Sequence, residues 1–168
     1  YRKAASIGIF GDGFEEVYGG HGQRDAILRM VIMQELAMAG AGGVVASMLS
    51  NYIALPTIQR AGSNEMKAKV LTPCLAGDAV SALAITEPSG GSDVARIKTV
   101  AKRDGEEFIV NGQKTFITSG MYADYLTVAV RTGGEGARGI SLLLIEVDRE
   151  GVERTRLDKM GWLSSDTA

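Results

Sequence analysis

Residues 78–93 read DAVSALAITEPSGGSD, and within them the chain changes the period of its apolar residues. Before Asp78, apolar residues recur every three or four positions, which is the spacing of amphipathic helices. From Val80 to Glu87 they form a short, nearly continuous apolar run, which is typical of a buried strand. Pro88 ends this run because proline has no amide proton to donate to a sheet. The chain is therefore predicted to consist of a helical part followed by a β part.

The helical part covers residues 1–77, and its apolar spacing predicts three helices that pack on one another. Asp25 and Ser63 are expected to cap the first and the third, since both residue types accept hydrogen bonds from free helix amides. Pro56 is expected to kink or restart the second. Five of the seven methionines lie in this part, and we interpret them as packing core rather than a ligand groove. The predicted inward-facing residues are Ile27, Met30, Val31, Gln34, Met38, Val45, Met48, Leu49, Tyr52, Ile53, Met66, Val70, Leu71, Cys74 and Leu75.

The β part covers residues 78–168 and consists of short apolar stretches separated by turn residues. Asp104-Gly105 and Asn111-Gly112 are hairpin signals, because both dipeptides allow two successive residues to take positive φ angles. Short strands joined by tight turns indicate an antiparallel barrel or sandwich. We therefore expect an α+β fold, with an N-terminal helical bundle portion followed by an antiparallel β-barrel. The predicted strands are 80–87, 97–103, 108–110, 113–118, 125–131, 140–147 and 152–157.

Composition excludes several classes of protein. With 18 basic and 20 acidic residues the net charge is −2, so no basic surplus favours binding to nucleic acid. Cys74 is the single cysteine and His21 the single histidine, which excludes a disulfide framework within the chain and a paired-histidine metal site. Cys74 is expected to be a buried structural thiol, and His21, in a glycine-rich turn, to be solvated. No apolar run is long enough to span a membrane.

Two clusters have the residues to bind a ligand. TEPSGGSD at 86–93 follows a strand, and its glycines let backbone amides approach a ligand closely; it has no lysine and is no nucleotide P-loop. KTFITSG at 114–120 would, as a strand, place Phe116 and Thr118 on one face and Ile117 on the other. That face would offer a ring for stacking and a hydroxyl. The alternatives are a polar surface turn for the first cluster, and a core ring and a strand-forming threonine for the second.

The sequence resembles the acyl-CoA dehydrogenases, and the matching motifs follow one another in the family's order along nearly the whole chain. Tyr18-Gly19-Gly20 and Glu35-Leu36-Ala37 match in the helical part. In the β part the matching motifs are Ala84-Ile85-Thr86-Glu87-Pro88, Gly91-Ser92-Asp93, Ile97-Lys98-Thr99, Val110-Asn111-Gly112-Gln113-Lys114, Phe116-Ile117-Thr118-Ser119-Gly120, Gly139-Ile140-Ser141-Leu142, Leu157-Asp158-Lys159-Met160-Gly161 and Ser165-Asp166-Thr167.

The resemblance implies an FAD enzyme that removes hydrogens from Cα and Cβ of an acyl-CoA thioester and passes electrons to an electron-transfer flavoprotein. Many members have tryptophan at the position of Phe116, which is implied to stack on the isoalloxazine; Thr118 is implied to lie near the flavin N5. Ser92 also corresponds to a contact with the thioester arm of the substrate. The implied cofactor-binding residues are Leu83, Ile85, Thr86, Gly91, Ser92, Phe116, Ile117 and Thr118.

The family's catalytic glutamate lies in a C-terminal helical domain that is not among these residues, so no catalytic residue is assigned here. Glu87, in the cluster at 86–93, is interpreted as structural. We expect the chain to be part of a longer protein that forms a homotetramer or homodimer, and to be inactive alone. We expect a cytoplasmic location in bacteria or the mitochondrial matrix in eukaryotes, with no targeting segment in this chain. The alternatives are an acyl-CoA oxidase or flavin monooxygenase on the same scaffold, and a non-catalytic flavin-binding protein.

Overall fold

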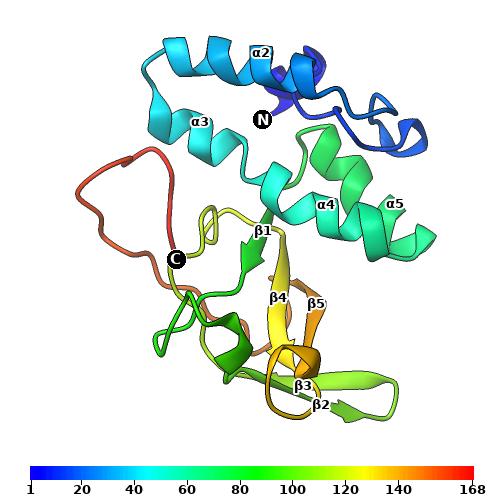
Figure 1. Ribbon diagram of the computed structural model, residues 1–168, viewed down its shortest axis with the longest axis vertical. Coiled ribbons are helices and arrows are strands. Elements are labelled where there is room, and N and C mark those ends of the chain that lie inside the picture. The colour runs from blue at the N-terminus through cyan, green and yellow to red at the C-terminus, as the bar shows by residue number, and fades with distance from the viewer.

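The computed structural model describes residues 1–168 and confirms the α+β class, with all α-helices preceding the strands (Figure 1). The helical half is drawn in blue to green and lies on one side of the β half. Short 3₁₀ turns also occur, at Glu16–Tyr18, Val94–Arg96 and Ala137–Gly139. The α-helices are α1 (Arg2–Ser6), α2 (Ala26–Met38), α3 (Gly42–Met48), α4 (Asn51–Ala61) and α5 (Asn64–Leu75).

The predicted helix caps are confirmed, whereas the predicted restart of the second helix at Pro56 is wrong. The Asp25 carboxylate accepts hydrogen bonds from the first amides of α2, and the Ser63 hydroxyl accepts one from the Met66 amide of α5. The second predicted helix is divided into α3 and α4 at Leu49 and Ser50, upstream of Pro56. Pro56 lies inside α4, and the helix continues although proline has no amide proton and one backbone hydrogen bond is lost.

The apolar face predicted for α2 is not buried within this chain. Ile27, Met30 and Met38 are 68%, 67% and 66% exposed, and α2 has no buried residue, so the interpretation as packing core is wrong for this helix. The helical core instead forms between residues 4–18, α4 and α5. Its buried members are Ala4, Phe10, Phe14, Tyr18, Leu55, Ile58, Val70, Leu71, Cys74, Leu75 and Ala79. The burial of Cys74 beside Val70 and Leu71 is as predicted.

The sheet is built around β4 and is mixed and open, not a closed antiparallel barrel. β4 pairs in parallel with β1 and antiparallel with β5. The antiparallel hairpin of β2 and β3 joins it where Val100 pairs with Arg131. β1 and β4 run in the same direction because the long excursion of residues 85–124 carries the chain back before β4 begins. The strands are β1 (Ser81–Ala84), β2 (Val100–Asp104), β3 (Glu107–Asn111), β4 (Tyr125–Arg131) and β5 (Ile140–Glu146).

Two predicted strands and one predicted hairpin turn are wrong. Residues 113–118 and 152–157 form loops, and the chain leaves the sheet at Asn111-Gly112 without turning into a partner strand. Phe116 has φ 59°, a left-handed conformation that a strand cannot contain. The hairpin at Asp104-Gly105 is confirmed, with Gly105 at φ 60° joining β2 to β3.

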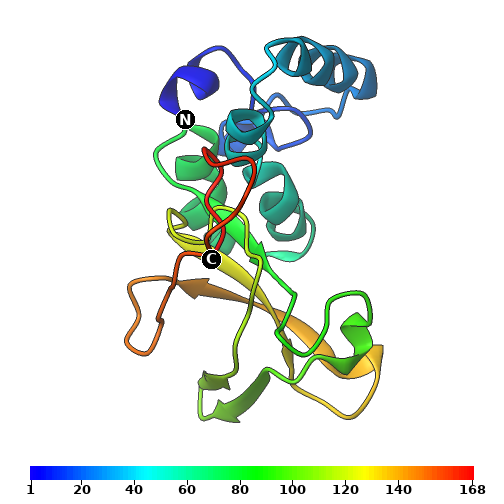
Figure 2. The ribbon, with the colours of Figure 1, turned by 90° about the vertical axis from the view of Figure 1, so that its left-hand side faces the viewer.

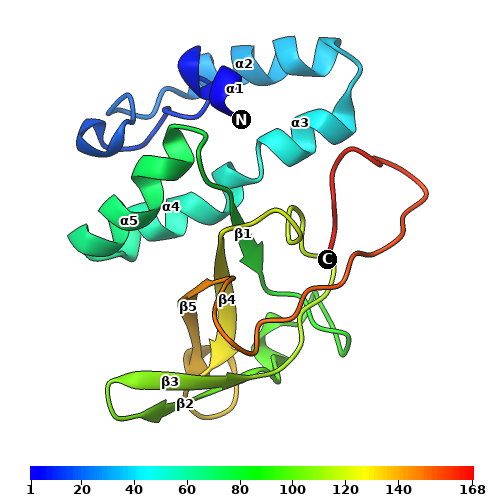
Figure 3. The same ribbon diagram turned by 180° about the vertical axis from the view of Figure 1, so that it is seen from behind.

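The last residues of the chain return to the helical half. Figures 2 and 3 show this segment, in red, rising from the β half towards α3. A side chain on Gly43 would lie 2.7 Å from Ser164 Oγ and 3.0 Å from the Trp162 Cα, so α3 needs a glycine where the segment touches it. The backbone of Ala168 then exchanges two hydrogen bonds with Ile117.

Candidate functional site

A hollow of about 210 Å³ lies where the helical half meets the β half, and we call it the junction hollow. One wall comes from β1 and the loop after it, and another from the loop that precedes β4. The α3–α4 junction and the start of α4 supply the rest. The lining residues are Ser50, Ile53, Leu83, Ile85, Thr86, Phe116, Ile117 and Thr118. Six of the eight residues predicted to bind the cofactor therefore lie together.

The lining is apolar with hydroxyl groups among the apolar side chains. Leu83, Ile85 and Ile117 provide aliphatic surface, and Thr86 and Thr118 provide hydroxyls. The hollow can therefore accept a ligand that is flat and mostly apolar but carries hydrogen-bonding atoms along an edge.

Phe116 stands at the rim in a strained conformation. Its side chain is 69% exposed and its φ is 59°, and a non-glycine residue in the left-handed region costs on the order of 1–3 kcal/mol. Hydrogen bonds of 2.9 Å hold both of its neighbours, from the Thr115 amide to the Thr86 carbonyl and from the Ile117 amide to the Ala168 carbonyl. The strand argument that placed Phe116 and Thr118 on one face is wrong, but this loop still brings both to the junction hollow.

Gly91 and Ser92 are not in the lining. Both are exposed on the loop after β1. A side chain on Gly91 would lie 3.3 Å from Thr86 Cγ2, so the glycine lets the loop fold back against Thr86. The contacts predicted for Gly91 and Ser92 stay predictions.

Ser50 and Ile53 line the junction hollow and were missed by the sequence reasoning. Ser50 is 2% exposed, and its hydroxyl has no hydrogen-bond partner within the chain. Neither residue belongs to a sequence motif. The helical spacing of the apolar residues gave no reason to assign positions of this part to a binding site rather than to packing. Only the approach of the α3–α4 junction to β1 brings them to the site.

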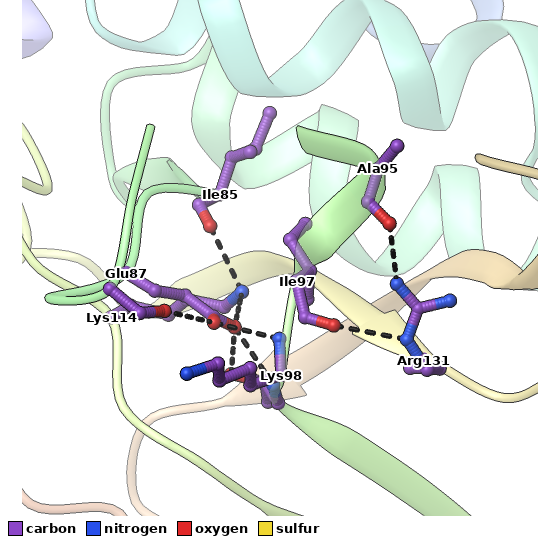
Figure 4. A network of polar contacts seen from close by, with 9 residues as sticks. Ile85, Glu87, Ala95, Ile97, Lys98, Lys114 and Arg131 are labelled. Atoms are coloured by element: carbon purple, nitrogen blue, oxygen red, sulfur yellow. Dashed lines mark hydrogen bonds and ion pairs between the residues drawn. The ribbon is translucent and has the colours of Figure 1, made fainter. Parts of the chain in front are cut away.

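Next to the junction hollow lies a polar cluster that we call the Glu87 network, formed by the side chains of Glu87, Thr99 and Lys114 and the backbone amide of Lys98 (Figure 4). The Glu87 carboxylate accepts hydrogen bonds of 2.8 Å from the amides of Lys98 and Thr99. Lys114 Nζ lies 2.9 Å from Glu87 Oε1, and the two side chains are only 10% and 4% exposed. The same ammonium donates to the Ile85 carbonyl at 2.9 Å.

This environment determines the charge of Glu87. Burial alone would raise the pKa of its carboxyl group, but hydrogen bonds from Thr99, Lys98 and Lys114 outweigh burial and lower the pKa from 4.5 to about 2. Glu87 is therefore a fully engaged carboxylate at neutral pH and a poor proton acceptor. The interpretation of Glu87 as structural fits its contacts.

Arg131 holds the far side of the segment that contacts Glu87, as Figure 4 also shows. Its guanidinium donates to the carbonyls of Ala95 and Ile97, at 2.7 and 3.0 Å. It also bonds the carbonyls of Gly134 and Gly136. Residues 95–99 are thus fixed between Arg131 and Glu87.

The other chemically versatile residues form no second site. Cys74 is free and buried, and burial raises the pKa of its thiol to about 12. His21 is exposed, as expected. The acidic, cysteine and histidine side chains form no group of three that could hold a metal ion. None of the helices combines the length and the apolar character needed to cross a membrane.

Comparison with known proteins identifies the family. Residues 1–78 match the family model described as the N-terminal domain of acyl-CoA dehydrogenase, and residues 82–168 match the middle domain. The chain belongs to the acyl-CoA dehydrogenase family.

Individual relatives agree with this assignment. Acyl-CoA dehydrogenase AFT10-1 of Alternaria alternata is 42% identical over 140 residues, which are 83% of this chain and 32% of that protein. A crystal structure of an acyl-CoA dehydrogenase from Mycobacterium smegmatis is 48% identical, with a TM-score of 0.94 over 99% of this chain and 44% of that one. A glutaryl-CoA dehydrogenase of M. smegmatis, solved in complex with FADH2, is 31% identical, with a TM-score of 0.79 over 99% and 42%. The chain thus spans less than half the length of these relatives.

Proposed function

We propose that this chain forms part of the FAD site of an enzyme that introduces a double bond between Cα and Cβ of an acyl-CoA thioester. The observation that carries the proposal is the junction hollow, where six residues matched to the family's flavin contacts lie together. Bound there, the flavin would supply the hydride acceptor. The family's electron-transfer flavoprotein would then receive the electrons, and the full-length protein would act as a homotetramer or homodimer.

The residues of the junction hollow fit an isoalloxazine ring. The ring system is flat, with an apolar end and a polar edge, and it needs aliphatic and aromatic surface beside hydrogen-bonding groups. Leu83, Ile85 and Ile117 supply the aliphatic surface, and Phe116 supplies an exposed aromatic ring at the rim. Thr86 and Thr118 supply hydroxyls for the polar edge, and the unpartnered hydroxyl of Ser50 is a third group of this kind.

Three residues would then have defined tasks. Phe116 would cover one face of the ring and exclude water from it. The Thr118 hydroxyl would be a hydrogen-bond donor for the polar edge of the ring. Ser92, on the exposed loop, would meet the thioester arm of the substrate. The lining of the junction hollow contains no carboxylate that could remove the α-proton, and the nearby Glu87 is held by its own partners. That base is expected from the family's C-terminal domain.

The test is the anaerobic reduction of the FAD-loaded, full-length protein by a series of saturated acyl-CoA thioesters of increasing chain length, followed as loss of the flavin absorbance. We expect at least one thioester to reduce the flavin, and Thr118→Val to slow the reduction while FAD stays bound. Thr118→Ser, which keeps the hydroxyl, is the matched control and should reduce nearly as fast as the unmodified protein.

Two results would change the proposal. A flavin that no acyl-CoA thioester reduces would contradict a dehydrogenase and leave a non-catalytic flavin protein. Rapid reoxidation of the reduced flavin by air would indicate an acyl-CoA oxidase or a flavin monooxygenase, because a dehydrogenase that serves an electron-transfer flavoprotein suppresses this reaction.

A further inference from the structure

Lys114 does not line the junction hollow, but its largely buried ammonium bonds the carbonyl of Ile85, which does. Its side chain is 10% exposed, and Nζ makes two hydrogen bonds of 2.9 Å, to the Glu87 carboxylate and to the Ile85 carbonyl. Figure 4 shows the ammonium between these two acceptors. Two of its three donors are therefore committed to the loop that follows β1.

Net stability is a weak explanation for a charged pair at this place. Removing two charges from water offsets most of their attraction, and well-packed apolar residues often stabilise a protein as much. What the ammonium adds is direction, because its donors require acceptors at fixed positions. Here the acceptors are Ile85, which lines the junction hollow, and Glu87, whose other contacts fix residues 98 and 99.

Lys114 also stands at the start of the opposite wall. Two residues later the chain reaches Phe116, whose left-handed conformation persists only while its surroundings hold it. The adjacent Thr115 amide bonds the Thr86 carbonyl at 2.9 Å. The two walls are thus joined by a pair of neighbouring links, one through the Lys114 side chain and one through the Thr115 backbone.

We propose that Lys114 is a positioning residue for the cofactor: by holding the Ile85 carbonyl and the Glu87 carboxylate it sets the spacing between the two walls of the junction hollow. This inference rests on the proposed function, because it takes the ligand between the walls to be FAD. Without the ammonium, the Ile85 carbonyl loses its donor and the Phe116 loop loses one of its links. The ring of Phe116 and the hydroxyl of Thr118 would then no longer be held where the flavin needs them.

The test compares Lys114→Met with Arg131→Met in the full-length, FAD-loaded protein. Arg131→Met is the matched control, because Arg131 also holds backbone carbonyls of the segment that contacts Glu87 but does not reach the junction hollow. Three quantities are measured for each: the melting temperature, the dissociation constant for FAD, and the position and fine structure of the visible flavin absorption band. The last two are recorded at a temperature where circular dichroism shows both variants folded.

For Lys114→Met we expect FAD binding to weaken by about 10-fold or more, because both hydrogen bonds of the charged donor are lost, and we expect an altered flavin band. Arg131→Met should melt earlier but bind FAD with an unchanged band. Equal FAD affinity and equal bands in both variants would overturn the role of Lys114. If Lys114→Met does not fold, the double variant Lys114→Met/Glu87→Gln, which also lacks the ammonium but leaves no unpaired carboxylate, replaces it under the same criteria. A folded, unmodified protein that binds no FAD would overturn the proposed function, and this inference with it.

Discussion

Glu87→Gln should destabilise the chain in a manner that depends on pH. The carboxyl group titrates near 4.5 when unfolded and at about 2 in the folded chain. The difference between these pKa values corresponds to about 3 kcal/mol by which the ionised carboxylate stabilises the folded chain relative to its protonated form. Because the folded pKa is the lower one, this contribution is complete above pH 4.5 and is lost as the pH falls towards 2. Between pH 7 and pH 3 about 2 kcal/mol of it should disappear.

The assay is urea unfolding of the unmodified chain and of Glu87→Gln at pH 7 and pH 3. The difference in the free energy of unfolding between the two should be about 2 kcal/mol smaller at pH 3 than at pH 7. Glu106→Gln is the control, because the Glu106 side chain is 98% exposed, and its difference from the unmodified chain should hardly change with pH. A Glu87→Gln difference that is the same at both pH values would refute the account of the Glu87 network.

Three further predictions concern other parts of the chain. Gly112→Ala would place a side chain 2.4 Å from Thr99 Oγ1 and should destabilise the chain by about 1–3 kcal/mol. The control is Gly161→Ala, whose side chain would meet nothing within 4 Å and should leave the stability unchanged. Thermal unfolding of the two variants is compared, and equal stability would contradict the prediction. Cys74 should resist thiol reagents in the native chain, since a pKa of about 12 instead of 9 leaves about a thousandfold less thiolate, and fast labelling without unfolding would contradict this. The purified 168-residue chain should not turn over any acyl-CoA, because a positioned general base is worth roughly 10²- to 10⁴-fold; measurable turnover would show that this chain supplies a base of its own.

The order of helices and strands could be predicted from the sequence because it depends on local signals. Asp25, Ser63 and Gly105 act through their own backbone neighbourhood, and each is found as expected. The prediction of a strand over 113–118 was wrong because it used only the alternation of side chains along the segment and not the segment's hydrogen-bond partners elsewhere in the chain. Phe116 turns left-handed where Thr115 bonds Thr86 and Ile117 bonds Ala168, and neither contact is visible in a local pattern.

The candidate site was predictable in part, through the resemblance to a family rather than through periodicity. That resemblance selected six of the lining residues. Ser50 and Ile53 could not be found, since they reach the junction hollow only when α4 packs near β1. The bonds of Lys114 to Ile85 and Glu87 were also hidden, because each depends on two loops meeting. The exposed apolar face of α2 was predicted to be buried, because helical spacing predicts an apolar face but not what packs against it.

The most direct measurement of the central claim is the FAD content of the full-length protein, in its unmodified form and as Phe116→Ala and Phe116→Trp. Phe116 is 69% exposed here, so truncating its ring removes little packing within this chain and should act on the ligand instead. The account predicts stoichiometric FAD in the unmodified protein and in Phe116→Trp, which keeps an aromatic ring, and loss of FAD on dilution in Phe116→Ala. Stoichiometric, tightly held FAD in Phe116→Ala would contradict the assignment of the junction hollow as the flavin site.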